Sequence, residues 1–244
     1  MIVRHRASQG GFQVGFARSD AEILEAQRFR HEIFTAETGA RFSNPGIDED
    51  RFDPYCDHLL IRDAGGRLAG YTRLLTQEQA MHCGGFYTET EFDMRKVLKL
   101  PGRFLEVGRT CIHPDYRNGA TIAVLWSGIA PILKDHGYQF LFGCVSIPLA
   151  GGVGPVRALI RQTLASHECE ASLRVTPRLP LPNMARRDVS PSAPPPLLKA
   201  YLRLGAQICG EASWDREFRT ADLMALLQRD RLTPRYERHF LKAS

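Results

Sequence analysis

The sequence lacks the features that would place the protein in a membrane, around a metal ion or in an oxidising compartment. No apolar run approaches the ~20 residues of a membrane-spanning helix, and residues 1–16 lack the continuous apolar core of a signal peptide. The six cysteines include no C-x-x-C pair, which argues against a zinc site and against a disulfide framework. We therefore expect a cytoplasmic protein, free or in peripheral contact with the inner membrane, with reduced thiols and no bound metal.

Familiar loop motifs for nucleotides and calcium are missing as well. The glycine-rich stretch at residues 150–155 has neither the Lys-Ser/Thr ending of a phosphate-binding loop nor the glycine spacing of a dinucleotide-binding turn. The acidic stretch at residues 48–57 lacks the glycine and the glutamate of a calcium loop. No internal repeat is present, so the length of 244 residues predicts a single domain spanning residues 1–244.

Charge is distributed unevenly along the chain. The net charge is +5, but residues 1–176 hold 20 basic and 20 acidic residues, whereas residues 177–244 hold 12 basic and 7 acidic ones. This bias suits an acidic carrier protein, an anionic membrane surface or nucleic acid, and it equally suits a solvated basic face without a partner. Nucleic acid is the poorest of these readings, because neither aromatic-basic interleaving nor a helix-turn-helix signal accompanies the charge.

The most informative stretch is Phe104–His136. It predicts a strand carrying Glu106 and Arg109, a polar turn over His113–Ala120, and an amphipathic helix that stops at Gly137. The apolar residues at helical spacing are Ile122, Leu125, Trp126, Ile129, Ile132 and Leu133. A strand that leads through such a turn into a helix N-terminus builds an anion site, and we expect it to bind a phosphate.

Side-chain alternation would put Glu106 and Arg109 on opposite faces of a regular strand. A bulge at Gly108 would bring both to one side, and an interior glycine is a reasonable marker of a bulge. Tyr138–Ile147 then reads as a buried strand parallel to the first. Glu106 would lie near a phosphate-bearing substrate, as suits a general base or an acid that positions water.

Two more arginines fall on apolar faces upstream. Ser19 to Glu22 resemble a capping box for a helix that reaches about Thr38 and stops at Gly39, and Arg30 lies on its apolar stripe. His58–Arg62 and Leu68–Leu75 read as a hairpin, with Arg73 on a mostly apolar face. Each arginine either pairs with a buried anion or extends to the edge of its stripe.

The remaining segments complete a mixed layout. We expect short helices at Glu91–Leu98, Val156–Ser166 and Leu197–Leu204, and final strands at Gln207–Trp214 and Thr220–Leu227. Seven of the fifteen prolines lie between residues 177 and 196, which predicts a poorly structured arm or lid. The fold class is thus α/β (α+β), with a mixed, mostly antiparallel twisted sheet flanked by helices and a Pro-rich excursion near the C-terminus.

At this point the sequence resembles a known family. The segments that carry the resemblance are FDPYCDHLL, GGFYTETEFD, LEVGRTCIHPDYRNGATI, LFGC and PPLLKAYLRLGA. Together they are similar to the GNAT N-acyltransferase superfamily. Within it, they are most similar to the bacterial L-ornithine N(alpha)-acyltransferases of ornithine-lipid biosynthesis and, more distantly, to the acyl-homoserine lactone synthases.

The resemblance implies transfer of a long-chain (3-hydroxy)acyl group from an acyl carrier protein to the α-amine of an amino acid. The acceptor that it favours is L-ornithine. It implies no cofactor beyond the phosphopantetheine of the carrier protein. It implies catalytic roles for Glu106, Arg109, Asp50 and Asp53. It implies substrate binding by Arg30, Phe34, Arg73, Thr110, Cys111 and Ile112. It implies that the phosphopantetheine rests on Arg117, Asn118, Gly119, Ala120 and Thr121.

Departures from the family pattern sharpen the choice of donor. The superfamily turn for acyl-CoA is Q/R-x-x-G-x-G/A, whereas Arg117 is followed by glycine after only one intervening residue. This departure favours a carrier protein, which presents a single phosphate and no adenosine. Glutamine, glycine, lysine or tyrosine stay open as acceptors, as do a lactone-type synthase and a non-catalytic carrier-binding scaffold. If the acceptor is ornithine, Asp48, Glu49 or Asp57 would pair with its second ammonium.

Overall fold

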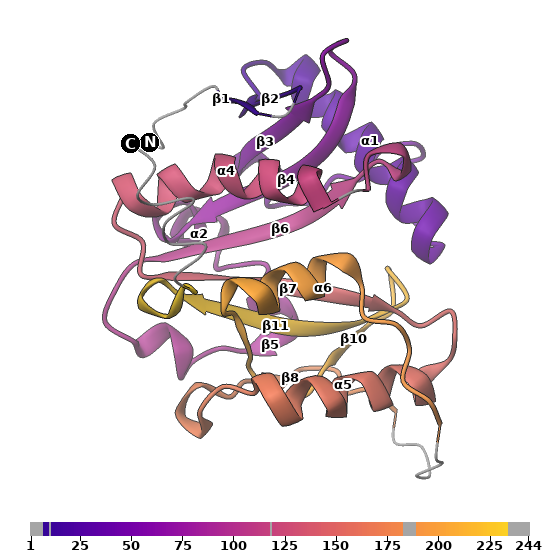
Figure 1. Ribbon diagram of the computed structural model, residues 1–244, viewed down its shortest axis with the longest axis vertical. Helices are drawn as coiled ribbons and strands as arrows, with labels where there is room; N and C mark the ends of the chain where they lie inside the picture. Colours follow the sequence, from indigo (N-terminus) through magenta and orange to yellow (C-terminus); the bar gives the residue numbers. More distant parts are fainter. Residues whose placement is uncertain (1–6, 10, 118, 183–188, 234–244) are drawn as a thin grey trace.

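The computed structural model describes residues 7–9, 11–117, 119–182 and 189–233. One large twisted sheet runs through the molecule in the order β1-β2-β3-β4-β6-β7-β11-β10, with β9 paired to β11 (Figure 1). Its strands are β1 (Ala7–Gln9), β2 (Phe12–Phe16), β3 (Asp57–Arg62), β4 (Leu68–Thr76), β6 (Phe104–Ile112), β7 (Phe140–Pro148), β9 (Gln207–Ile208), β10 (Ser213–Asp215) and β11 (Thr220–Gln228). β5 (Phe92–Asp93) and β8 (Thr176–Pro177) form a separate small ribbon.

Helices cover both faces of this sheet (Figure 1). They are α1 (Asp20–Thr38), α2 (Gln77–Cys83), α3 (Thr88–Glu91), α4 (Gly119–Asp135), α5 (Val153–His167) and α6 (Pro196–Leu204). On β3, Leu59 and Ile61 belong to the core beneath α4, whereas Leu60 belongs to the core beneath α1, as the alternation of a strand requires. The mixed, mostly antiparallel architecture predicted from the sequence is confirmed.

The element that positions the site is the crossover β6-α4-β7. β6 and β7 are parallel, but their pairing covers only Phe104–Glu106 against Phe140–Phe142. Beyond it the strands diverge, and among the described residues the edge of β6 that faces β7 has no strand partner from Val107 onward. Gly143 permits the close approach at the point of divergence, because a Cβ there would collide with the carbonyl oxygen of Val107.

Helix ends follow the sequence signals closely. The Ser19 hydroxyl accepts from the backbone N–H of Glu22 at 3.3 Å, and Gly39 ends α1 with φ 70°. Gly205 ends α6 in the same way with φ 103°. The boundaries of α1 and α6 therefore agree closely with the prediction, and Arg30 and the α6 side chains lie on the helices expected for them.

Several local expectations are wrong. Residues 91–98 form no helix; α3 ends at Glu91, β5 follows, and a 3-10 turn covers Val97–Lys99. α5 already begins at Val153, so part of the glycine-rich stretch is helical. The Pro-rich segment at residues 177–196 overlaps β8 only at Pro177 and α6 only at Pro196, and its residues 183–188 lie outside the described residues, so the predicted arm stays a prediction. Within the described residues, no helix combines the length and apolar character needed to cross a membrane.

Candidate active site

A cavity of about 400 Å³ opens where β6 and β7 diverge. Its walls come from the C-terminal half of β6, from Cys144 to Pro148 on β7, and from the start of α4. α1 contributes Phe34, and α6 closes the cavity with Leu197, Ala200 and Leu204. Of the residues predicted from the sequence, the cavity brings together Glu106, Arg109, Phe34, Thr110, Cys111, Ile112 and Arg117.

A bulge in β6 turns Arg109 into this cavity. Tyr71 and Arg73 on β4 pair with Cys111 and Gly108, so β6 holds one extra residue opposite Thr72. The extra residue lies at Arg109, which has φ 50°, an uncommon conformation for a non-glycine residue. The predicted bulge is therefore present, displaced by one residue from Gly108. Glu106 and Arg109 consequently line the same cavity.

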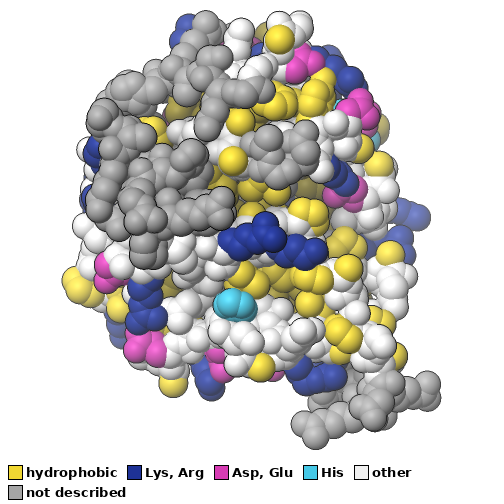
Figure 2. Space-filling view, in the orientation of Figure 1, with side chains coloured by type: hydrophobic (Ala, Val, Ile, Leu, Met, Phe, Trp, Pro, Cys, Tyr) yellow, Lys and Arg dark blue, Asp and Glu magenta, His cyan; other side chains and the backbone are white. Residues whose placement is uncertain are grey.

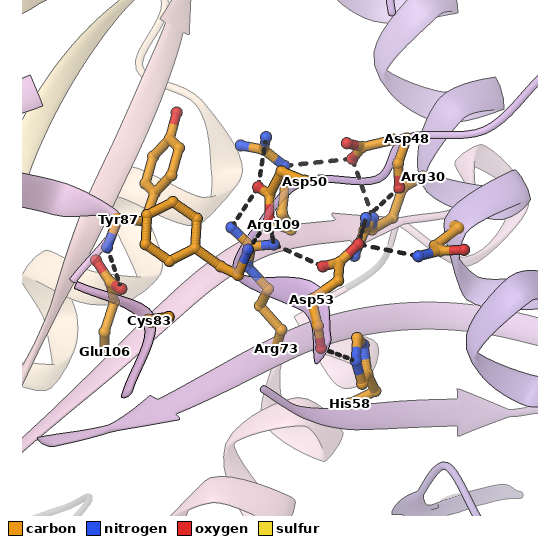
Figure 3. A network of polar contacts seen from close by, with 12 residues as sticks. Arg30, Asp48, Asp50, Asp53, His58, Arg73, Cys83, Tyr87, Glu106 and Arg109 are labelled. Carbon is orange, nitrogen blue, oxygen red and sulfur yellow. Dashed lines mark hydrogen bonds and ion pairs between the residues drawn. The ribbon is translucent and has the colours of Figure 1, made fainter. Parts of the chain in front are cut away.

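Arg109 is one member of a closed ring of alternating charges, and its two neighbours in the ring hold its guanidinium in place (Figure 3). The ring contains three arginines and three aspartates, and each neighbouring pair is joined by an ion pair. In order around the ring the members are Arg30, Asp48, Arg109, Asp50, Arg73 and Asp53. The N···O distances range from 2.6 Å for Arg73–Asp53 to 3.3 Å for Arg109–Asp48.

Mutual compensation explains how these charges tolerate burial. Arg30 is 0% exposed, yet its guanidinium also donates to the hydroxyl of Tyr71 at 3.0 Å. Burial acts to raise the pKa of Asp53, but Arg30 and Arg73 hold it well below its usual range. Because each charge of the ring has two partners of opposite sign, as buried charges need, the network fixes the positions of these side chains.

Four members of the ring that were expected in the site lie away from the cavity. Arg30, Arg73, Asp50 and Asp53 do not line the cavity, although the resemblance implies substrate-binding and catalytic roles for them. Arg109 alone among the ring members reaches the cavity wall. We therefore interpret the other members as positioning residues that fix the Arg109 guanidinium.

Glu106 stands apart from the ring and is held by the start of α3. Its carboxylate accepts from the backbone N–H of Tyr87 at 2.9 Å, and from the N–H and hydroxyl of Thr88 at 2.6 and 2.5 Å. Burial nevertheless raises the pKa of Glu106, against the opposing effect of the Thr88 hydrogen bonds. A buried carboxylate with a raised pKa that lines a cavity can accept a proton from a bound ligand.

The opposite end of the cavity is basic. Arg117 lines it, ion-pairs with Glu37 and donates from Nε to the carbonyl of Ile112 at 3.0 Å. α6 adds Lys199 and Arg203, two exposed cations that also line the cavity. Figure 2 shows Lys and Arg side chains crossing the middle of this face above apolar ones, where Figure 1 places α6. The sequence alone does not indicate a role for these two α6 cations.

The other four residues expected to contact the phosphopantetheine lie either outside the described residues or at the start of α4. Asn118 lies outside the described residues, and Gly119 and Ala120 form the beginning of α4. Thr121 is buried, its hydroxyl donates to the carbonyl of Tyr116 at 2.6 Å, and it does not line the cavity. Thr121 therefore stabilises the turn before α4.

The two cysteines beside the site are poor nucleophiles. Cys111 and Cys144 both line the cavity. Burial raises the pKa of each thiol well above its ordinary value, so both stay protonated at neutral pH. They therefore act as small residues of the cavity wall.

Acidic residues missed by the sequence reading complete the wall. Asp215 on β10 and Asp222 on β11 line the cavity, beside the ring of Tyr87. The loop acids expected to bind a second ammonium are engaged elsewhere: Asp48 in the ring, Glu49 with Asn44 at 2.7 Å, and Asp57 with Gln79 at 2.9 Å. A carboxylate within the otherwise apolar β11 was the available signal for Asp222.

Comparison with known proteins agrees with this architecture. The family model of the acetyltransferase (GNAT) domain matches residues 29–127. The solved structure of FeeM, an N-acyl amino acid synthase from uncultured soil microbes, superposes with a TM-score of 0.52 at 9% identity. That match covers 93% of this chain and 92% of the FeeM chain, and it supports the fold alone. Fold and site thus define an acyltransferase of the GNAT class.

Sequence relatives give a narrower assignment. The L-ornithine N(alpha)-acyltransferase of Brucella abortus (strain 2308) is 34% identical, with 93% of this chain and 88% of that protein aligned. The enzyme of the same name from Rhizobium meliloti (strain 1021) is 35% identical, with 92% and 82% aligned. The chain belongs to the same family as these acyltransferases, and it is an amino-acid N-acyltransferase. The resemblance seen in the sequence is confirmed.

Proposed function

We propose that this protein transfers a long-chain (3-hydroxy)acyl group from an acyl carrier protein to the α-amine of L-ornithine, giving a lyso-aminolipid. The observation that carries the proposal is the shared cavity of Glu106 and Arg109, at the divergence of β6 and β7. The names of the relatives support ornithine as the acceptor.

The acceptor end of the cavity supplies the groups that amide formation needs. Arg109 pairs with the α-carboxylate of the amino acid, and Glu106 takes a proton from the α-ammonium. A base is required because free amines have pKa values of about 8–10 and are mostly protonated at neutral pH. The freed amine attacks the thioester carbon and the C–N bond forms. The C–S bond then breaks, and the departing thiolate takes up the second proton that the nitrogen loses on becoming an amide.

Developing charge on the thioester oxygen also needs stabilisation. The unpaired edge of β6 supports a role for backbone N–H groups around Thr110 and Ile112, since preorganised donors stabilise such an oxyanion strongly. The raised thiol pKa values argue for direct transfer without a covalent intermediate on Cys111 or Cys144.

The donor end supports a carrier protein. Arg117, Lys199 and Arg203 surround the cavity with positive charge, which suits one phosphate and an acidic protein surface. The same cavity is lined by apolar side chains of α4 and α6, including Ile122, Trp126 and Leu197. Their surface suits an alkyl chain.

The experiment that tests this function offers long-chain 3-hydroxyacyl carrier protein with a panel of amino acids. We expect stoichiometric release of the carrier thiol and an amide of ornithine, identified by its mass. Replacing the carrier protein by the corresponding acyl-CoA should lower the rate. Exclusive acylation of glutamine, glycine, lysine or tyrosine would replace ornithine as the acceptor, and thiol release without any amide would contradict the function.

A further inference from the structure

Two buried acids on the cavity wall have no role in the transfer described above. Asp215 is 8% exposed and Asp222 is 2% exposed, and both line the cavity. Asp215 accepts from the backbone N–H of Phe218 at 2.9 Å, and Asp222 accepts from the hydroxyl of Thr220 at 2.7 Å. Within the described chain, neither carboxylate forms an ion pair, in contrast to every aspartate of the charge ring.

Tyr87 links these acids to the acceptor groups. Its backbone N–H donates to Glu106 at 2.9 Å, and its hydroxyl lies 3.5 Å from Asp215. The Arg109 guanidinium carbon lies 4.9 Å from the centre of the Tyr87 ring. Glu106 and Asp215 therefore stand at opposite ends of one tyrosine, with Arg109 over its face.

Arg109 brings a cation to the same part of the cavity. Its side chain is 10% exposed and forms ion pairs with Asp48 at 3.3 Å and with Asp50 at 3.1 Å. The cavity thus presents a guanidinium whose position the charge ring fixes and, beyond the tyrosine ring, two acids that form no ion pair within the described residues.

The electrostatics of the acids favour a cation between them. Burial, and then the neighbouring charge of Asp215, raise the pKa of Asp222 to about 7. Glu91 adds a third negative group nearby, and its hydrogen bond from Ser213 measures 2.8 Å. A bound ammonium would offset both the burial and the mutual repulsion.

We infer that Asp215 and Asp222 bind a second ammonium group on the acceptor, so that the cavity selects diamino acids over neutral ones. An acceptor whose carboxylate meets Arg109 and whose α-amine meets Glu106 would extend its side chain along Tyr87 towards the two acids. This inference rests on the proposed function and assigns its acceptor specificity to residues of the final hairpin.

The test compares L-ornithine with L-norvaline, which has the same carbon skeleton and no second amine. The wild-type protein should prefer ornithine in kcat/KM by roughly 10- to 100-fold, as expected for a hydrogen bond between charged groups. Asp222→Asn should lose most of that preference, because its kcat/KM for ornithine falls more than its kcat/KM for norvaline. Asp215→Asn provides a second variant with the same expected loss. Glu211→Gln, an exposed acid outside the cavity, is the matched control and should keep the preference.

The preference is a ratio measured on one preparation, so partial misfolding of a variant does not alter it. Equal use of both acceptors by the wild type, or an undiminished preference in both Asp variants, would overturn the inference and leave the proposed function intact. Failure of the wild type to acylate either acceptor would overturn the proposed function together with the inference.

Discussion

Removing the Thr88 hydroxyl tests whether Glu106 is the proton acceptor without deleting its carboxylate. Thr88 is fully buried, and its hydroxyl donates to Glu106 Oε1 at 2.5 Å, while the backbone N–H of Thr88 donates to the same oxygen at 2.6 Å. Thr88→Val keeps the shape of the side chain and both backbone donors and removes one hydrogen bond to the ionised form.

The size of the effect follows from that single bond. A hydrogen bond to a charged group contributes about 1.5–3 kcal/mol, and one pKa unit corresponds to ~1.4 kcal/mol. Burial already raises the pKa of Glu106, and the Thr88 hydroxyl opposes that shift. Losing the hydroxyl should therefore raise the pKa of Glu106 further, by about 1–2 units.

The assay is the pH profile of kcat/KM, followed by release of the carrier thiol. Activity falls at low pH as the base becomes protonated, so the acid limb should move to higher pH in Thr88→Val. Thr88→Ser, which restores the hydroxyl, should return the limb to its wild-type position. An acid limb that stays in place in the valine variant, with unchanged thermal stability, would refute the assignment of Glu106.

Three further predictions address the ring, the donor end and the acidic wall. Asp53→Asn should destabilise the fold by about 3–5 kcal/mol in chemical denaturation, because it leaves two buried arginines short of a counter-charge; a loss below ~1 kcal/mol would contradict the ring's structural role. Reversing Lys199 and Arg203 to Glu should raise KM for the acyl carrier protein about tenfold or more and reduce its salt dependence, with KM for the amino acid unchanged. Folding raises the pKa of Asp222, so ionisation of this carboxyl group lowers the stability of the fold. The cost is absent below about pH 4 and grows as pH rises towards 7. Asp222→Asn should accordingly be more stable than wild type by up to about 4 kcal/mol at pH 8 and about as stable as wild type at pH 4, and a stability difference from wild type that is the same at both pH values would contradict the pKa shift.

Local signals made much of the fold predictable. Caps at Ser19, Gly39 and Gly205 set helix boundaries, because they satisfy or end backbone hydrogen bonding within a few residues. Alternation and the helix after β6 likewise predicted the parallel pair β6 and β7. By contrast, residues 91–98 were misread as a helix, since α3 and β5 there depend on a ribbon with β8, far away in the sequence.

The site was predictable only where the chemistry is concentrated in one segment. Glu106 and Arg109 were predictable because both lie on one strand and because Gly108 within that strand indicates a bulge. Arg30 and Arg73 were recognised as unusual, but a pattern along one helix or strand cannot show that their aspartates close a ring behind Arg109. The acids of the final hairpin were missed for the same reason, as Asp215 meets Tyr87 across 128 positions of sequence.

The α6 cations illustrate a further limit. Charge counting predicted a basic C-terminal quarter, whereas the structure places Lys199 and Arg203 on the exposed edge of a helix that closes the cavity. Their spacing of four residues puts both on one face, but only tertiary packing turns that face towards the cavity that Arg117 also lines.

The most direct test of the central claim is the turnover of Glu106→Gln with acyl carrier protein and ornithine. Glutamine retains the size of the side chain and an oxygen that accepts from the start of α3, but it cannot take the proton of the α-ammonium. We predict that kcat falls by ~10²-fold or more while thermal unfolding shows a folded protein. A folded Glu106→Gln variant that turns over at nearly the wild-type rate would contradict the account.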